Sequence, residues 1–254
     1  MITKNSSQQV DDLLELMPSS GPFSKMRILI ICGGKSPEHD VSLVSASGII
    51  EALDKEKYDY QVVGIAPDGR FLTSRTLDVL EVMKKKHYEQ LEPVSLNLDP
   101  NHNNLIYLDS FIRSEKIELI FPVLHGPFGE DGTIQGLLEM AGIPYVGCGV
   151  LASAACMDKV MTKSVLNNWK IPIVPFISFF ELNWVEKSAT LISAVESDLT
   201  WPVFVKPANA GSSIGVSKAK NKEEFILAVN EALKFDNQVL VEKAIKAREL
   251  ECSV

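Results

Sequence analysis

Val205-Lys-Pro-Ala-Asn-Ala-Gly-Ser-Ser-Ile-Gly-Val216 is the stretch that decides the fold of this chain. The apolar run Trp201 to Val205 predicts a strand that ends at Lys206, and Val216 begins a second strand. Between them, glycines let backbone N–H groups approach an anion, serines add hydroxyl donors, and the lysine adds a positive charge. The donors of this turn are Gly211, Ser212, Ser213 and Gly215. Together these groups predict a clamp for a polyphosphate.

The order of these residues excludes one common phosphate site. In a Walker P-loop the lysine follows the glycines and a helix begins there, whereas Lys206 precedes the glycines and a strand follows. From this stretch alone, an ordinary Gly/Ser hairpin with an incidental lysine is the alternative.

The composition limits the class of protein and of ligand. A chain of 254 residues is long enough for about two domains. Its hydrophobic content of 46% and charged content of 23% are typical of soluble globular proteins. The net charge of -8 argues against nucleic acid or an anionic membrane as the partner. Local lysines must therefore hold any anionic ligand.

The cysteines and the N-terminal residues indicate the compartment. Cys32, Cys148, Cys156 and Cys252 form no Cys-x-x-Cys pair and no metal-ligand spacing, which predicts reduced thiols. Residues 1–25 contain one short apolar cluster, Leu13 to Met17, which is too short and too acidic for a signal peptide. No apolar run is long enough to span a bilayer. We expect a cytoplasmic protein.

The first half of the chain alternates predicted strands and helices. Arg27 to Cys32 is a continuous apolar run, as expected for a strand that is buried on both faces. The further predicted elements are a helix at His39 to Leu53, strands at Tyr60 to Ala66 and Ile117 to Leu124, and a helix at Thr133 to Met140. Residues 75–116 are weakly patterned. The alternation predicts an α/β, Rossmann-like parallel-sheet N-terminal domain at 26–147, after an N-terminal extension at 1–25.

The second half predicts a smaller α+β unit. One helix is expected from about Ser153 to Trp169, with Met157, Met161, Val165 and Trp169 as its buried stripe. A helix at Glu223 to Leu233 and a strand at Gln238 to Glu242 follow the clamp. We place this central lobe at 148–241 and the start of another lobe at 242–254.

Five short segments in this order resemble the D-alanine–D-alanine ligase family of the ATP-grasp fold. They are Gly33-Gly-Lys-Ser-Pro-Glu-His-Asp-Val-Ser-Leu43, His125-Gly-Pro-Phe-Gly-Glu-Asp-Gly132, Met157-Asp-Lys159, Val205 to Val216, and Val241-Glu-Lys-Ala-Ile245 with Glu249. The match runs from about residue 26 to the last residue.

The resemblance assigns a first-substrate site to residues of the N-terminal domain. Glu38 lies at the expected carboxyl end of a strand, where a carboxylate can hold an ammonium, although a glutamate favoured by a helix N-terminus is the alternative. In the family, Glu38 would position the amino group of the first D-alanine, with Ser212 bonded nearby; both are the predicted catalytic residues. His125 would lie near this D-alanine or orient Glu38; a loop-stabilising histidine is the alternative. Glu130 and Asp131 are expected to stabilise their loop and the next helix.

The resemblance also assigns an ATP site. Lys159 and Lys206 would bind the phosphates, and the Gly211, Ser212 and Ser213 loop would close over the γ-phosphate. Glu242 and the backbone of Lys243 and Ile245 would contact adenine, and Glu249 would contact the ribose. From the residues alone, Lys159 would be a solvated helix lysine, and Glu242 with Lys243 an exposed strand pair.

The implied activity is ATP-dependent ligation of two D-alanines through an acyl phosphate, for peptidoglycan precursor synthesis. The implied ligands are ATP, D-alanine and Mg²⁺, and a homodimer remains open. The family's Mg²⁺ ligands, an Asp and a Glu-x-Asn, have no counterpart here, so no metal ligand is predicted. We therefore expect this chain to be part of a longer protein or a truncated product, and to be inactive by itself. The alternatives are a D-alanine–D-lactate ligase and a non-catalytic nucleotide-binding remnant.

Overall fold

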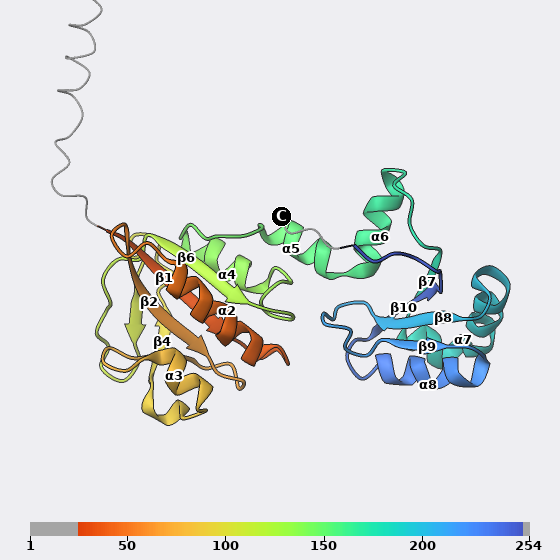
Figure 1. The fold of residues 1–254 in the computed structure, drawn as a ribbon, viewed down its shortest axis with the longest axis horizontal. Helices are drawn as coiled ribbons and strands as arrows, with labels where there is room; N and C mark the ends of the chain where they lie inside the picture. Colours follow the sequence, from red (N-terminus) through yellow and green to blue (C-terminus); the bar gives the residue numbers. More distant parts are fainter. Residues whose placement is uncertain (1–24, 251–254) are drawn as a thin grey trace, which may run out of the picture.

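The computed structural model describes residues 25–250, which form two lobes with separate β-sheets (Figure 1). The first lobe contains β1 (Met26–Gly33), α2 (His39–Ala52), β2 (Tyr58–Ile65), β3 (Phe71–Thr73), α3 (Val79–Lys84), η1 (Tyr88–Gln90), β4 (Glu92–Leu96), β5 (Leu105–Tyr107), β6 (Leu119–Leu124) and α4 (Thr133–Ala141). Next come α5 (Val150–Met157) and α6 (Lys159–Asn168). The second lobe contains β7 (Phe176–Phe180), α7 (Glu181–Ala194), η2 (Val195–Leu199), β8 (Val203–Pro207), β9 (Ser217–Ala219), α8 (Lys222–Ala232) and β10 (Gln238–Lys243).

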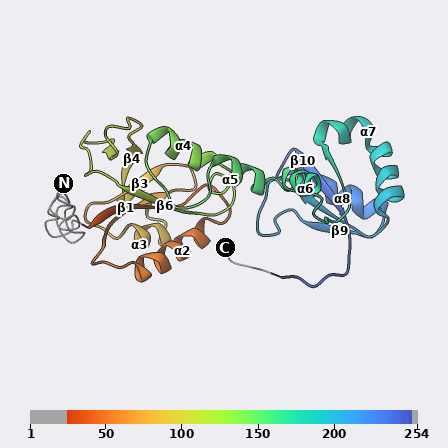
Figure 2. The ribbon, with the colours of Figure 1, turned by 90° about the horizontal axis from the view of Figure 1, so that it is seen from above.

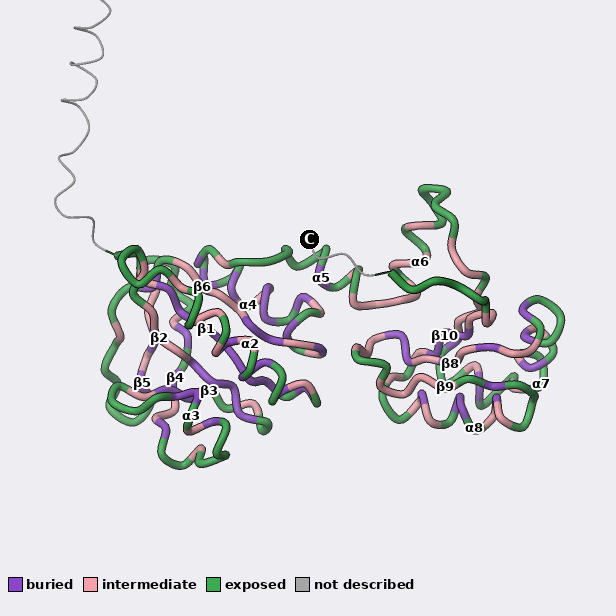
Figure 3. The backbone as a smooth tube through the Cα atoms, viewed as in Figure 1, coloured by how far each residue is buried: buried purple, intermediate pink, exposed green. Residues whose placement is uncertain are grey.

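β1 is the central strand of the parallel part of the first sheet, whose order is β5-β4-β3-β2-β1-β6. Because successive residues of a strand point to opposite faces, Ile28 and Ile30 pack with α2 and α3, whereas Leu29 and Ile31 pack with α4. Residues 28–32 are at most 3% exposed, which confirms the predicted strand buried on both faces. Figure 3 shows that burial is concentrated in this central part of the sheet.

The first sheet is mixed rather than wholly parallel. β1 pairs in parallel with β2 and β6, as predicted, but β3, β4 and β5 continue the sheet in antiparallel orientation. β4 and β5 come from the weakly patterned region 75–116, and β3 lies just before it. In the parallel part, Gly33 is in register with Ile65 and Leu124, so three strands end at one edge. The loops that carry Glu38 and His125 leave from this edge.

The second sheet is antiparallel, with the order β7-β10-β8-β9. Val203 and Val205 of β8 and Val239 and Val241 of β10 pack against α7 and α8 around the fully buried Phe225. The alternate residues of β8 and β10 therefore point to the other face, beneath α6 (Figure 1). The predicted strands and helix of this unit are confirmed as β8, β9, α8 and β10, while β7 and α7 were not predicted.

The segment between the lobes corrects the prediction of one helix from Ser153 to Trp169. Asp158 interrupts it with extended backbone, and its carboxylate accepts hydrogen bonds from the N–H groups of Val160 and Met161 at 2.8 and 2.9 Å to cap α6. The predicted buried stripe is also wrong: Met161, Val165 and Trp169 are 50%, 44% and 73% exposed. Figure 2 shows α5 and α6 as the connection between the lobes. The opposite side of α6, which carries Lys159 and Lys163, faces the sheet.

Two predicted segments fall partly outside the described residues. These are the N-terminal extension, of which residues 1–24 are not described, and the start of the last lobe, of which residues 251–254, including Cys252, are not described. Within residues 25–250, every helix is too short or too polar to cross a bilayer.

Candidate functional site

The loop between β8 and β9 extends toward the first lobe (Figure 1). Its backbone is left-handed at Ser212 (φ 47°), Ser213 (φ 59°) and Gly215 (φ 68°). Serine rarely adopts this conformation because its Cβ crowds the following carbonyl. Two backbone hydrogen bonds within the loop stabilise the turn. The N–H of Ile214 donates to Gly211 O at 3.0 Å, and the N–H of Val216 donates to Ser213 O at 3.2 Å. The donors predicted from the sequence are thus gathered in one compact, strained loop.

The tip of this loop contacts Glu38 in the first lobe. The Ser212 hydroxyl donates a hydrogen bond to Glu38 Oε1 across 174 residues of sequence. The N–H of Glu38 donates to Ser36 Oγ at 3.0 Å, which fixes the start of α2. Glu38 Oε2 is buried and has no hydrogen-bond partner within residues 25–250. One carboxylate oxygen is therefore free to accept a hydrogen bond from a ligand.

Gly126 leaves room for this carboxylate. A Cβ on Gly126, where φ is 69°, would overlap Glu38 Oε2 and lie 2.6 Å from Ser36 Oγ. A Cβ on Gly211 would lie 3.4 Å from Glu38 Oε2. The loop after β6 thus approaches Glu38 so closely at Gly126 that only glycine fits there, whereas the distance at Gly211 is an ordinary contact.

His125 begins the loop after β6, half-buried, with its Nε2 3.0 Å from the Ser45 hydroxyl of α2. This hydrogen bond holds the His125 ring against α2. Among the described residues, His125 has no hydrogen bond to Glu38, so the predicted orienting contact is not present. Glu130 and Asp131 stabilise the loop as predicted: Glu130 accepts from Gly126 N–H at 2.8 Å. Although burial opposes it, hydrogen bonds from backbone N–H groups and Thr133 lower the pKa of Asp131.

A second group of charged residues lies between α6 and the sheet of the second lobe. Lys206 on β8 and Glu242 on β10 point to the same face and form an ion pair. Lys163 on α6 reaches Glu242 Oε1 at 2.5 Å. Lys159 donates to the carbonyls of Ala208 and Ala210, the latter at 2.5 Å. A cavity of about 330 Å³ is lined by Cys156, Lys159, Thr162, Lys163, Leu166, Ile173, Val174, Lys206, Leu240 and Glu242.

The electrostatics of this cavity favour an anion. Burial and the neighbouring Lys206 ammonium lower the pKa of Lys159. Burial alone would raise the pKa of Glu242, but hydrogen bonds from Lys163 and Lys206 lower it, so the carboxylate stays ionised. The lining of the cavity itself carries three lysines and one carboxylate, while Asp158 and Asp236 lie close enough to Lys159 to act on its charge. The excess positive charge of the lining suits a phosphate.

The remaining predicted nucleotide residues lie farther along the chain. The N–H of Lys243 donates to Pro175 O at 3.1 Å, at the end of β10. Ile245 and Glu249 belong to the exposed stretch 245–250, and the Glu249 carboxylate has no hydrogen bond or ion pair within the described residues. The alternative that Glu242 belongs to an exposed strand pair is wrong, since its side chain is only 13% exposed.

Sequence reasoning missed three contributors to these groups: Lys163, Ser45 and Gly126. The signal for Lys163 is its spacing of four residues from Lys159, which places both on one side of a helix. No sequence signal identifies Ser45 or Gly126, because their roles depend on how the loop after β6 lies against α2.

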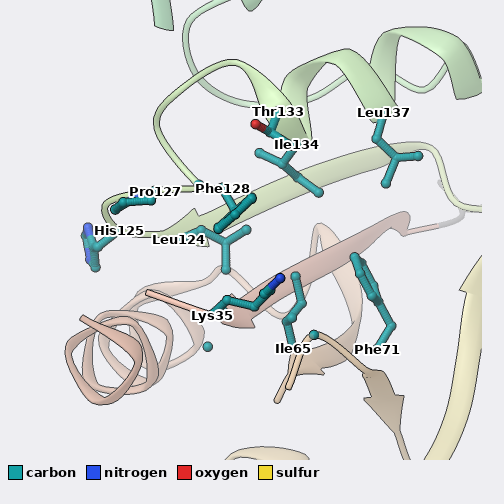
Figure 4. A pocket seen from close by; sticks show the side chains of 14 residues that line it. Lys35, Ile65, Phe71, Leu124, His125, Pro127, Phe128, Thr133, Ile134 and Leu137 are labelled. Carbon is teal, nitrogen blue, oxygen red and sulfur yellow. The ribbon is translucent and has the colours of Figure 1, made fainter. Parts of the chain in front are cut away.

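A separate apolar cavity of about 290 Å³ lies behind the His125 loop (Figure 4). Ile65, Phe71, Leu124 and Leu137 line it, and Lys35 lies over the Phe128 ring at 4.8 Å. Within residues 25–250, no group of three His, Cys, Asp or Glu side chains has the arrangement of a metal site.

Comparison with known proteins places both lobes in one family. A family profile described as D-ala D-ala ligase N-terminus matches residues 27–148, and one described as D-ala D-ala ligase C-terminus matches residues 165–254. The chain is 43% identical over 233 residues to a D-alanine–D-alanine ligase of Natranaerobius thermophilus and 42% identical over 236 residues to D-alanine–D-alanine ligase A of Escherichia coli K12. These alignments cover 91% of this chain, which spans 63% and 64% of the two relatives.

Solved structures of similar fold are ligases of the same kind. The VanG D-Ala:D-Ser ligase of Enterococcus faecalis matches with a TM-score of 0.78 and 34% identity, over 88% of this chain and 64% of that protein. The D-alanine-D-alanine ligase of Coxiella burnetii matches with a TM-score of 0.75 and 33% identity, over 88% of this chain and 65% of that protein.

Proposed function

The chain belongs to the D-alanine–D-alanine ligase family, and we propose that its protein joins two D-alanines at the expense of ATP. A carboxylate oxygen of the first D-alanine attacks the γ-phosphorus, the bond between the γ-phosphorus and the β–γ bridging oxygen breaks, and ADP leaves. The amino group of the second D-alanine then attacks the acyl phosphate carbon, phosphate leaves with its bridging oxygen, and the nitrogen loses a proton. The dipeptide would serve peptidoglycan precursor synthesis.

The contact between Ser212 and Glu38 carries this proposal. It joins the tip of the Gly/Ser loop to a carboxylate of the other lobe, so that a phosphate held by the loop and an amino acid held by Glu38 would meet. The unpaired, buried Glu38 Oε2 supports a role in accepting a hydrogen bond from the D-alanine ammonium. His125, fixed by Ser45, would border the same substrate.

The nucleotide would occupy the cavity between α6 and the second sheet. Lys159 and Lys206 would hold its phosphates, and Gly211, Ser212 and Ser213 would close over the γ-phosphate and limit the access of water. Glu242, Lys243, Ile245 and Glu249 remain the proposed contacts to the nucleoside. Holding the two reactants in line, next to fixed positive charge, is the main catalytic contribution of these residues.

Mg²⁺ would neutralise the phosphates in such a reaction. The described residues do not fit it, because none of their acidic groups forms a metal-type cluster. We therefore derive no step through the metal from this chain.

The test uses the protein as its gene encodes it and measures ATP binding and D-alanine-dependent phosphate release separately. We expect both, with D-alanyl-D-alanine as the product by mass spectrometry. Glu38→Gln should raise KM for D-alanine, and Lys206→Met should weaken ATP binding, while Lys220→Met, an exposed lysine, should change neither. ATP binding without D-alanine-dependent phosphate release would instead support a nucleotide-binding remnant, and no ATP binding would overturn the proposal.

The second substrate is tested in the same assay. Because a similar structure is a D-Ala:D-Ser ligase, D-serine and D-lactate replace D-alanine in parallel reactions with ¹³C-labelled first substrate. The labelled dipeptide of D-alanine should dominate; a labelled depsipeptide would establish a D-alanine–D-lactate ligase.

A further inference from the structure

Glu242 has two lysine partners whose surroundings differ. Its Oε1 bonds Lys163 at 2.5 Å, and its Oε2 bonds Lys206. The side chains of Lys163 and Glu242 are 12% and 13% exposed, whereas that of Lys206 is 26% exposed. The carboxylate is thus shared between a deeply placed lysine and one that is nearer to solvent.

Lys163 is held in place by contacts other than Glu242. Its ammonium donates to Val174 O at 3.2 Å and lies 5.2 Å from the centre of the Phe176 ring. Within residues 25–250, Glu242 is the hydrogen-bond partner of the Lys206 ammonium. Of the two lysines, Lys206 is therefore the one that can leave Glu242 without losing other contacts.

An incoming phosphate must compete with Glu242 for Lys206. Leaving a half-buried carboxylate without any cationic partner costs free energy, and the unpaired carboxylate also repels the arriving phosphate. Lys163 removes both penalties, since Glu242 keeps one partner after Lys206 has turned to the phosphate. Lys159 cannot take over this task in the observed arrangement, because its ammonium bonds the Ala208 and Ala210 carbonyls.

We propose that Lys163 is a positioning residue of the nucleotide site, which neutralises Glu242 so that Lys206 can exchange this carboxylate for a phosphate of the nucleotide. The inference rests on the proposed nucleotide site and adds to it a residue that does not itself touch the phosphate. It predicts that the effect of Lys163 depends on the charge of Glu242.

A double-mutant cycle tests this dependence, with the dissociation constant of ADP measured by calorimetry in the full protein. Lys163→Met should weaken ADP binding about tenfold or more, because Glu242 then retains Lys206. In the Glu242→Gln background, Lys163→Met should change ADP binding by no more than about threefold. Lys163→Arg, which keeps the charge, should bind ADP nearly as the unchanged protein does. Lys220→Met, an exposed lysine outside this cavity, is the control for the loss of one positive charge from the protein.

If Lys163→Met weakens binding equally in both backgrounds, Lys163 acts directly on the nucleotide or only on folding, and the inference is wrong. Equal affinities of Lys163→Met and the unchanged protein also overturn it. Thermal unfolding of every variant separates a folding defect from an effect on ADP binding, since only variants that remain folded at the assay temperature enter the cycle. If the unchanged protein itself does not bind ADP, the proposed function fails, independently of Lys163.

Discussion

Replacing Gly126 by alanine measures how tightly the first lobe encloses the Glu38 carboxylate. The new Cβ would lie 2.6 Å from Ser36 Oγ and closer still to Glu38 Oε2, whereas ordinary contact begins at 3.4 Å. The carboxylate and the hydroxyl must therefore each move by close to 1 Å. Such a shift breaks the hydrogen bonds that Glu38 makes with Ser212 and Ser36.

The expected loss of stability is the sum of two effects. Alanine in the left-handed region costs about 1 kcal/mol or somewhat more. The two lost hydrogen bonds cost about 1 kcal/mol each. Gly142→Ala is the matched control, since Gly142 has a similar φ of 65° and its Cβ would meet only Pro100, in one tight contact of 3.1 Å with the Cβ of that residue and without a hydrogen-bonded group. We expect Gly126→Ala to lower the free energy of unfolding by about 2 kcal/mol more than Gly142→Ala does.

Urea unfolding followed by two signals locates the effect. The three tryptophans, Trp169, Trp184 and Trp201, all lie outside the first lobe, so fluorescence reports the rest of the chain, whereas far-UV circular dichroism reports both lobes. Gly126→Ala should shift the dichroism transition of the first lobe and leave the core tryptophans Trp184 and Trp201 nearly unchanged. Losses within about 0.5 kcal/mol of each other for Gly126→Ala and Gly142→Ala would refute the reasoning. Glu38 would then move aside at no cost.

Three further outcomes are expected. Gly48→Ala, at an exposed position inside α2 with no atom within 4 Å of the new Cβ, should raise the free energy of urea unfolding by about 0.5–1 kcal/mol; a loss would contradict this. Because burial raises the pKa of Cys32 to about 12, a thiol reagent at pH 8 should label the exposed Cys148 and Cys156 and spare Cys32, as peptide mass spectrometry would show. Glu242, whose pKa lies below its usual 4.5, contributes stability above that pH that is lost as pH falls through the folded-state value. Glu242→Gln should therefore flatten the pH dependence of unfolding free energy there, and an unchanged slope would count against the ion pairs.

The strands that could be predicted from the sequence are those with continuous apolar runs. β1 is recognisable because nearly every residue faces a core, and β8 because the run Trp201 to Val205 is apolar although only its alternate residues are fully buried. The glycine turns that follow both strands are equally visible. β3 and β5 have three residues each, too few for a period of two to appear, so the antiparallel edge of the first sheet was not predictable.

The error at α6 has a different cause. An apolar residue at every fourth position predicts that a helix has one apolar face, but it does not show which face packs against the rest of the protein. In α6 the covered side carries Lys159 and Lys163, because Glu242 on the sheet below pairs with Lys163 and the carbonyls of Ala208 and Ala210 accept from Lys159. That pairing depends on the register of β10 against β8 and on where Asp158 redirects the chain, and neither is visible in a local sequence pattern.

The strain in the Gly/Ser loop and the contact between the lobes belong together. Ser212 and Ser213 hold left-handed backbone that costs each of them about 1 kcal/mol, so some interaction must hold the loop in this form. The hydrogen bond from Ser212 to Glu38 is such an interaction, and it comes from the other lobe. The loop is therefore ordered by the same carboxylate that we assign to the first D-alanine. A ligand that turns Glu38 Oε1 away from Ser212 would release the loop, whereas one that binds the unpaired Oε2 would leave the loop in place beside the proposed nucleotide site.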